Sequence, residues 1–152
     1  MEEIDSIDRT ILDALQSDAS RSTQEIAAVA GLSQNPCWRR IKRLEAAGFI
    51  RSRVAILDPD KLGVGITVFV SIRTNQHNDA WLERFASGVM EIPEVVELYR
   101  MSGEVDYLLK VLVSDIAEYD RIYKQLIEVA ELFDVSSSFA MERIKYTTAV
   151  PL

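Results

Sequence analysis

Start and stop signals for three short helices follow one another within the first 48 residues of the chain. Asp5, Ser22 and Ser33 can each begin a helix, because their side-chain oxygens accept hydrogen bonds from otherwise unpaired backbone N–H groups. A glutamate three residues after Ser22 adds the spacing of a capping box. Gly31 and Gly48 stand where the second and third helices would end. Three such helices, with a glycine in the turn between the second and the third, are typical of a helix-turn-helix.

The remainder of the chain alternates between strand and helix character. Residues 49–57 favour extended backbone, and the turn-forming residues 58–63 then mark a domain junction. Beyond it, strands are predicted at 67–73, 95–101, 106–113 and 135–145, and helices at 79–90 and after Ser114. The order βαββαβ indicates a ferredoxin-like antiparallel sheet with two helices on one face. The uncovered face would expose apolar residues, which is typical of an association surface.

The predicted fold class is therefore α+β, an N-terminal winged helix-turn-helix followed by a C-terminal ferredoxin-like βαββαβ domain. The predicted boundaries are 1–53 for the helix-turn-helix, 54–63 for a linker strand and hinge, and 64–152 for the sheet domain.

Charge is distributed unevenly between these parts. The chain carries a net charge of −7, but residues 1–57 hold eight basic and eight acidic side chains, so the excess acid belongs to the second part. Residues 39–53 contain six basic side chains and only one acidic side chain, Glu45. Since screening limits electrostatic reach to about 10 Å, a bound phosphate would respond to this local excess more than to the total.

One cysteine and one histidine restrict the chemistry. Cys37 alone forms no internal disulfide framework, and with only His77 beside it the chain has no multi-cysteine zinc site. No apolar run is long enough for a membrane span, and the acidic N-terminus is unlike a signal peptide. We expect a cytoplasmic protein without a metal or another cofactor.

The third predicted helix has two different faces. Cys37, Ile41 and Leu44 fall in one sector and form a buried stripe. The opposite sector carries Asn35, Arg39, Lys42, Arg43 and Ala46. Such a face suits the DNA major groove, where arginine or lysine reads guanine and asparagine reads adenine. The predicted DNA contacts are Ser33, Gln34, Asn35, Trp38, Arg39, Lys42, Arg43 and Arg51.

Three residues of this helix have alternative interpretations. Arg40 lies at the edge of the buried sector, so it either supports the domain or reaches phosphate beside Arg51 and Arg53. Trp38 flanks the cationic face, and packing against the protein is favoured over contact with a base. Cys37 points inward and is interpreted as a small core side chain, with redox sensing as the alternative.

Several segments resemble the leucine-responsive/asparagine regulator family of transcription regulators. They are residues 7–12 (IDRTIL), 32–50 (LSQNPCWRRIKRLEAAGFI), 57–63 (LDPDKLG), 102–108 (SGEVDYL) and 144–148 (IKYTT). Their order and separations match those of the family over essentially the whole chain. Pro36, Cys37 and Trp38 depart from the commoner family pattern. With residues 138–142 and 145–148 they resemble a subgroup that contains regulators of cysteine breakdown, so cysteine is a hypothesis for the effector.

The resemblance implies a protein that binds double-stranded DNA and an amino-acid effector. It implies homodimers built through the linker strand and the sheet domain, commonly assembled into octamers. In the family the effector pocket lies around the loop before the third strand, here Met101, Ser102, Gly103, Glu104 and Asp106, and a neighbouring dimer adds Ser136, Ser137 and Ser138. Gly103 would let backbone N–H groups approach a carboxylate, and Asp106 could accept from an ammonium group. Alternatively, these two residues only shape a hairpin turn.

Other function classes agree less well with the sequence. An enzyme would need a paired nucleophile and base or a phosphate-binding loop, and His77 lies in a polar loop segment. A stand-alone amino-acid-binding module would have no use for the cationic third helix. An effector-insensitive architectural DNA-binding protein remains the alternative, because a cationic face binds phosphate whatever the base sequence.

Overall fold

The computed structural model describes residues 3–152 and divides the chain into two compact units. The first, here called the helical unit, contains the residues up to Ile56 together with Ile144–Leu152. The second, the sheet unit, is Leu57–Arg143. Each unit has a hydrophobic core of its own, so the two are separate domains of one chain.

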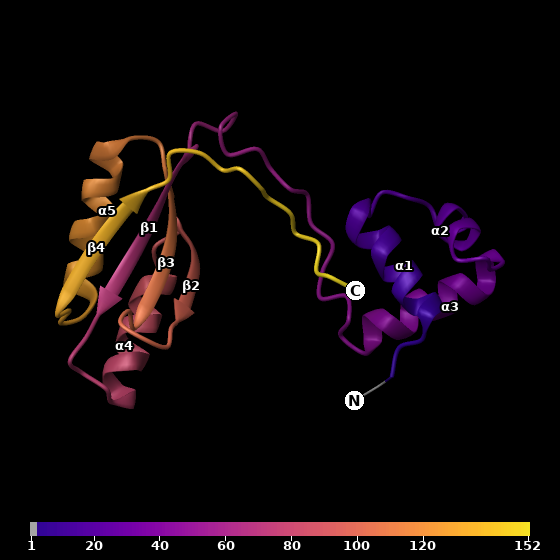
Figure 1. The fold of residues 1–152 in the computed structure, drawn as a ribbon, viewed down its shortest axis with the longest axis horizontal. Coiled ribbons are helices and arrows are strands. Elements are labelled where there is room, and N and C mark those ends of the chain that lie inside the picture. The colour runs from indigo at the N-terminus through magenta and orange to yellow at the C-terminus, as the bar shows by residue number, and fades with distance from the viewer. Residues whose placement is uncertain (1–2) are drawn as a thin grey trace. The chain divides into compact units, whose positions relative to one another are not determined.

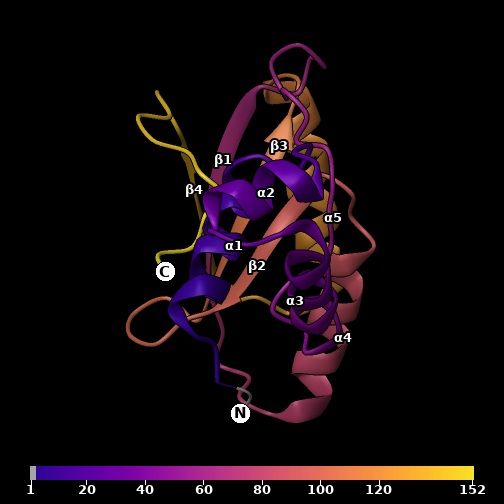
Figure 2. The same ribbon diagram turned by 90° about the vertical axis from the view of Figure 1, so that its right-hand side faces the viewer.

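The helical unit is built from α1 (Ser6–Ser17), α2 (Thr23–Val29) and α3 (Gln34–Ala46), which pack around one another (Figures 1 and 2). The apolar faces of the three helices meet in one core, whose buried members are Ile11, Ala14, Leu15, Ile26, Ala27, Cys37, Ile41 and Leu44. The three predicted helices and the helix-turn-helix are confirmed.

Local hydrogen bonds explain where these helices begin and end. The Asp5 side chain accepts from the Asp8 N–H at 2.8 Å, and the Asp8 side chain accepts from the Asp5 N–H, which together make a capping box. Ser22 and Glu25 form the same arrangement at the start of α2. Gly31, in the turn between α2 and α3, has φ +67°, a conformation that side chains with a Cβ rarely adopt.

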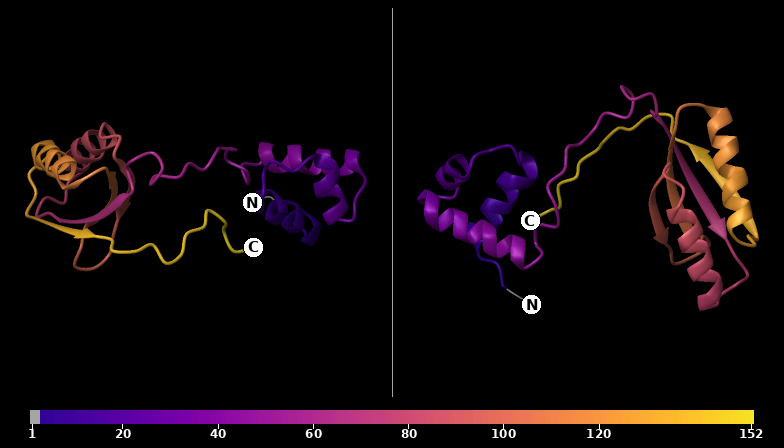
Figure 3. Two further views of the ribbon diagram at one scale, coloured as in Figure 1. Left: turned by 90° about the horizontal axis from the view of Figure 1, so that it is seen from above. Right: turned by 180° about the vertical axis from the view of Figure 1, so that it is seen from behind.

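The sheet unit contains β1 (Ile66–Arg73), α4 (Asp79–Met90), β2 (Val95–Arg100), β3 (Tyr107–Val113), α5 (Ile116–Val129) and β4 (Asp134–Phe139). All strand pairs are antiparallel, and the strand order is β2-β3-β1-β4. Both helices lie on one face of the sheet (Figure 3). The predicted ferredoxin-like arrangement is confirmed.

Aromatic rings fill the space between the sheet and its helices. Trp81 and Phe85 of α4 stack with ring centroids 4.9 Å apart, and both contact the Tyr107 ring. Gly88 lets α4 approach α5 closely, because a Cβ at that position would lie 2.4 Å from a Val129 methyl group. Phe85 is fully buried, so this cluster forms the centre of the larger core.

The opposite face of the sheet is open. It carries Phe69, Tyr99, Leu108 and Leu112, none of which is fully buried. Lys110 crosses this face to bind Glu97 with an N–O distance of 2.8 Å. The expectation of apolar residues on an uncovered sheet face agrees with this arrangement.

Two segments differ from the expectations. Among the described residues no strand precedes Ile66, so the segment 49–57, expected to favour extended backbone, and the linker strand predicted within 54–63 have no strand partner in the single chain. An extended segment becomes a strand only when a neighbouring strand supplies a ladder of hydrogen bonds, and the backbone N–H groups of Phe49 and Ile50 donate instead to the end of α3. The fourth strand ends at Phe139, earlier than the predicted 145, and residues 144–152 group by their contacts with the helical unit. No helix in the described part of the chain is long and apolar enough to span a membrane.

Candidate nucleic-acid interface and effector site

The two faces of α3 differ as predicted. Cys37, Ile41 and Leu44 are buried in the core of the helical unit, whereas Arg39 and Lys42 are exposed. Arg39 makes no ion pair within the described residues, and its guanidinium is available to a partner. The exposed side of α3 therefore presents donors of the kind that contact base edges and phosphates.

A buried carboxylate anchors two other arginines of α3 to α1. Asp8 is 1% exposed, and its Oδ1 accepts from Arg40 Nη1 at 2.8 Å while its Oδ2 pairs with Arg43. Arg40 also bonds Asp5 at 2.8 Å. Hydrogen bonds from the Asp8 N–H and from Arg40 hold the pKa of the Asp5 carboxyl below its usual value. Arg40 therefore supports the domain, and the Arg43 guanidinium, predicted to face DNA, also belongs to this anchor.

A second, exposed ion-pair group lies at the end of α3. Glu45 accepts from Lys42 at 2.7 Å and from Arg53 at 3.1 Å, and these contacts, with the Lys42 bond first, lower the Glu45 pKa. Ion pairs on the surface contribute about 0–1 kcal/mol, so a phosphate can replace Glu45 at small cost. Arg51 is exposed and has no ion pair among the described residues.

The start of α3 contributes polar groups to the same region. Ser33 is the N-cap, but its side chain makes no capping hydrogen bond, and Gln34 and Asn35 are exposed. Trp38 is 52% exposed and borders a shallow hollow with Arg21, so it is only partly packed against the protein. Burial raises the pKa of the Cys37 thiol, which agrees with a core side chain and not with a reactive thiolate.

The loop between β2 and β3 forms the second candidate site. Gly103 has φ +115°, a conformation that favours glycine. The loop is closed by a hydrogen bond from the Met101 N–H to the Asp106 carbonyl at 2.8 Å. The Asp106 carboxylate accepts from the Thr74 N–H at 2.8 Å through Oδ2. Asp106 thus fixes the loop against the end of β1 and retains one oxygen, Oδ1, for another contact.

A hollow of about 390 Å³ lies beside this loop. It is lined by Arg73, Thr74, Asn75, His77, Gly103, Glu104, Asp106 and Phe133. The Arg73 guanidinium lies 5.9 Å from the centre of the Phe133 ring. Of the predicted effector residues, Gly103, Glu104 and Asp106 meet here, while Met101 and Ser102 lie outside the lining.

The sequence analysis missed the part of this lining that comes from the end of β1 and from Phe133. A signal was present, because Arg73 closes a predicted strand and His77 follows four residues later. That signal requires knowing that β1 and β3 are neighbours, and the antiparallel pair Ile72 and Tyr107 brings the two segments together.

The three predicted serines of β4 do not line this hollow in a single chain. Ser136 and Ser138 pair with Ser71 and Phe69 of β1 and are exposed on the open sheet face. Ser137 points to the helix side, where it shares a hydrogen bond with the Tyr119 hydroxyl. A site that joins these serines to the Gly103 loop would therefore need a second chain, as the family resemblance implies.

Both parts of the chain match profiles of known protein domains. The profile of the AsnC-type helix-turn-helix domain matches residues 4–45, and that of the Lrp/AsnC ligand binding domain matches residues 67–150. The glutamate uptake regulatory protein of Zymomonas mobilis is 52% identical over 98% of this chain and 91% of its own length.

Two solved structures are similar over nearly the whole chain. An AsnC family transcriptional regulator from Agrobacterium tumefaciens has a TM-score of 0.94 and 57% identity, and covers 97% of both chains. A transcriptional regulator from Neisseria meningitidis, solved as a complex with L-Met, has a TM-score of 0.92 and 33% identity, and covers 98% of this chain and 97% of its own.

Proposed function

The chain belongs to the Lrp/AsnC family of transcription regulators, and we propose that it controls genes of amino-acid metabolism by reading a specific operator in response to a small amino acid. In this proposal the helical unit reads double-stranded DNA. The sheet unit assembles the protein and binds the effector.

The observation that carries the proposal is the exposed face of α3. Its apolar side is buried in the helical unit, while Arg39 stands exposed without an ion pair among the described residues. Arg39 would read guanine and Asn35 adenine, with Lys42 and Arg51 on phosphates. Ser33, Gln34, Trp38 and Arg43 complete the proposed contact surface.

The open sheet face supports assembly into homodimers, and further into octamers. Phe69 and Tyr99 are 39% and 50% exposed there, and Leu108, on the strand between theirs, is half-buried on the same face. Covering such residues with a second copy removes apolar surface from water. A dimer would also bring two reading heads to two half-sites of an operator.

The hollow beside the Gly103 loop supports an amino-acid site. Its volume of about 390 Å³ falls in the usual range for small ligands. Arg73 would face the effector carboxylate, and the second oxygen of Asp106 its ammonium group. Ser136 and Ser138 of another chain would complete the site. The related N. meningitidis regulator, whose structure contains L-Met, supports this ligand class, and cysteine is the specific hypothesis.

The DNA-binding half of the proposal is tested by footprinting the protein on its own promoter and then comparing two variants. Arg39→Ala should weaken operator binding by about 1–3 kcal/mol, whereas Lys42→Ala should weaken all sequences alike and reduce the salt dependence. Unchanged operator affinity in both variants would contradict the α3 assignment. Equal affinity of the parent for operator and scrambled DNA would favour the architectural alternative.

The effector half is tested with Asp106→Asn, which keeps an oxygen for the Thr74 N–H but removes the negative charge. This variant should assemble and bind operator like the parent, yet lose the change in gel shift caused by L-cysteine or L-methionine. A response at the same concentration as in the parent would place the effector elsewhere. Light scattering checks assembly, because a 17.2 kDa particle would be a monomer.

A further inference from the structure

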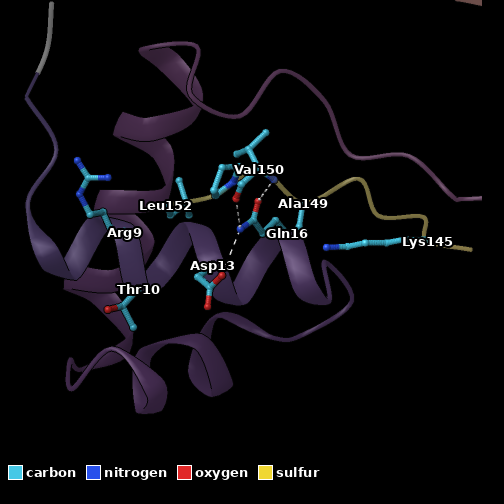
Figure 4. A pocket seen from close by; sticks show the side chains of 9 residues that line it. Arg9, Thr10, Asp13, Gln16, Lys145, Ala149, Val150 and Leu152 are labelled. Atoms are coloured by element: carbon cyan, nitrogen blue, oxygen red, sulfur yellow. Dashed lines mark hydrogen bonds between the residues drawn. The ribbon is translucent and has the colours of Figure 1, made fainter.

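A segment of the chain beyond the sheet unit lies against α1 of the helical unit. Gln16, near the end of α1, holds this segment through its side-chain amide (Figure 4). Gln16 Nε2 donates to the Val150 carbonyl at 3.0 Å, and the Val150 N–H donates to Gln16 Oε1 at 2.9 Å. The two bonds reproduce the reciprocal pair that two residues exchange in an antiparallel sheet. Because only the backbone of residue 150 takes part, the contact recognises extended chain.

The surroundings of Gln16 form a groove that is separate from the DNA-reading face. One side of the groove is formed by α1 residues and the other by the C-terminal segment, and none of the lining residues comes from α3. The α1 side is Arg9, Thr10, Asp13 and Gln16, and the segment contributes Lys145, Ala149, Val150, Pro151 and Leu152. Asp13 Oδ1 accepts from Gln16 Nε2 at 3.2 Å, which orients the amide toward the segment. The segment 149–152 can therefore remain docked while α3 contacts DNA.

We propose that this groove on α1 is the docking site of residues 149–152 of the same chain, and that docking provides a second tether on the helical unit. The first tether is the segment between α3 and β1, which has no helix or strand among residues 47–65. The second follows from connectivity, because residues up to Arg143 belong to the sheet unit and Ile144–Leu152 to the helical unit.

A second tether changes how two reading heads bind one operator. Once the first head of a dimer is bound, the second binds at an effective concentration set by the length and freedom of its connection. In this proposal docking narrows the range of orientations open to the helical unit, and so raises that effective concentration. The effect on operator binding therefore rests on the proposed function, whereas the docking of residues 149–152 does not.

Cross-linking tests the docking without DNA. The variant Arg9→Cys with Pro151→Cys places two thiols on the same groove and leaves Asp13 and Gln16 intact, and Cys37 is buried. A short bis-maleimide should link them within one chain, which a denaturing gel shows as a faster monomer band. The control pairs Gln24→Cys, exposed on α2 and outside the groove, with Pro151→Cys, and should not link. Absence of the link, or a link between two chains, overturns docking within the chain.

DNA binding tests the tether. Gln16→Ala removes both bonds to Val150, and a chain that ends at Thr148 removes the docked segment. Both should lose about 3- to 10-fold in affinity for an operator with two half-sites, with single half-site affinity unchanged. Gln24→Ala, a matched glutamine on α2, should bind like the parent. An equal loss of affinity for the two-half-site operator and the single half-site, or no loss for either, would contradict the role of docking as a tether. A parent that binds neither DNA contradicts the proposed function, while the cross-linking result still judges the docking.

Discussion

The two units hold themselves together by different means. Among the residues that the structure describes, the sheet unit buries fifteen in its apolar core, whereas the helical unit buries eight. The smaller core is supplemented by two capping boxes and by the buried Asp8 carboxylate between Arg40 and Arg43. Because those arginines belong to α3, the charges that stabilise the helical unit lie on the helix that we propose reads DNA. Under that proposal, stability and DNA binding depend on the same helix.

The chain carries a separate fluorescent reporter for each unit. Its two tryptophans are Trp38, which is exposed on α3, and Trp81, which is buried in the sheet unit. Chemical denaturation of Trp38→Phe therefore follows the sheet unit, and that of Trp81→Phe the helical unit. Each reporter variant serves as the reference for the substitutions made in it.

The largest effect is expected in the sheet unit. Phe85 is 0% exposed and contacts Trp81 and Tyr107, so Phe85→Ala leaves a cavity that costs about 3–5 kcal/mol of the free energy of unfolding. The transition reported by Trp81 should shift to lower denaturant, while that reported by Trp38 stays within about 0.5 kcal/mol of the parent. A common shift of both transitions would show that the units unfold together.

The next largest effect is expected in the helical unit. Asp8→Ala removes the shared partner of Arg40 and Arg43, and should destabilise the Trp38 transition by about 1–3 kcal/mol. The cost stays below that of a fully buried pair, because both guanidinium groups can turn to water.

Two arginines of α3 provide the matched control. Arg40→Ala should show part of the loss, and Arg39→Ala, which breaks no ion pair among the described residues, should change stability by less than about 0.5 kcal/mol. Equal effects of Arg39→Ala and Arg40→Ala would contradict the anchoring role of Asp8.

The features that could be predicted from the sequence are those that depend on residues close together along the chain. The helix start at Ser22 and the stripe of Cys37, Ile41 and Leu44 depend on residues three or four positions apart, and both were confirmed. Asp8 lies in the first turn of α1, where local sequence indicates only that an acidic side chain suits the positive end of the helix. Its arginine partners lie 32 and 35 residues later, and no local pattern identifies them.

The same reasoning applies to the candidate sites. The Gly103 turn was visible in the sequence, but the contribution of Arg73 to the hollow depends on the pairing of β1 with β3. The contact of Gln16 with Val150 spans 134 residues and uses a backbone group, so composition and periodicity contain no trace of it. The extended segment at 49–57 was expected as a strand because its residue types favour one, yet a strand also requires a partner.

A smaller effect is expected at the start of α2. Ser22→Ala removes the side-chain acceptor of the Glu25 N–H and should cost about 1 kcal/mol in the helical unit. Ser17→Ala, at the exposed end of α1, is the control and should be nearly neutral. If Ser22→Ala moved the Trp81 transition as much as the Trp38 transition, the separation of the two units would be incorrect.

The last prediction concerns the pH dependence of stability, which should be negligible near neutral pH and should differ between the two units in acid. A hydrogen bond from the Ser22 hydroxyl, followed by one from its backbone N–H, lowers the pKa of Glu25. Contacts that begin with Lys42 lower the pKa of Glu45, and the pKa values of Asp5 and Asp18 are lowered as well. The sheet unit has only two carboxyls of this kind among the described residues, Glu97 and Glu118.

A carboxyl whose pKa is lower in the folded state stabilises that state above its unfolded pKa of about 4, and this contribution is lost as the pH falls through the folded value. Between pH 7 and 5 neither transition should move for this reason. From about pH 4.5 downward the Trp38 transition should fall more steeply than the Trp81 transition, because more such carboxyls belong to the helical unit. Glu25→Gln keeps the capping box but does not titrate, so it should reduce that slope. Parallel slopes for both reporters, or an unchanged slope in Glu25→Gln, would mean that these carboxylates do not set the acid stability of the helical unit.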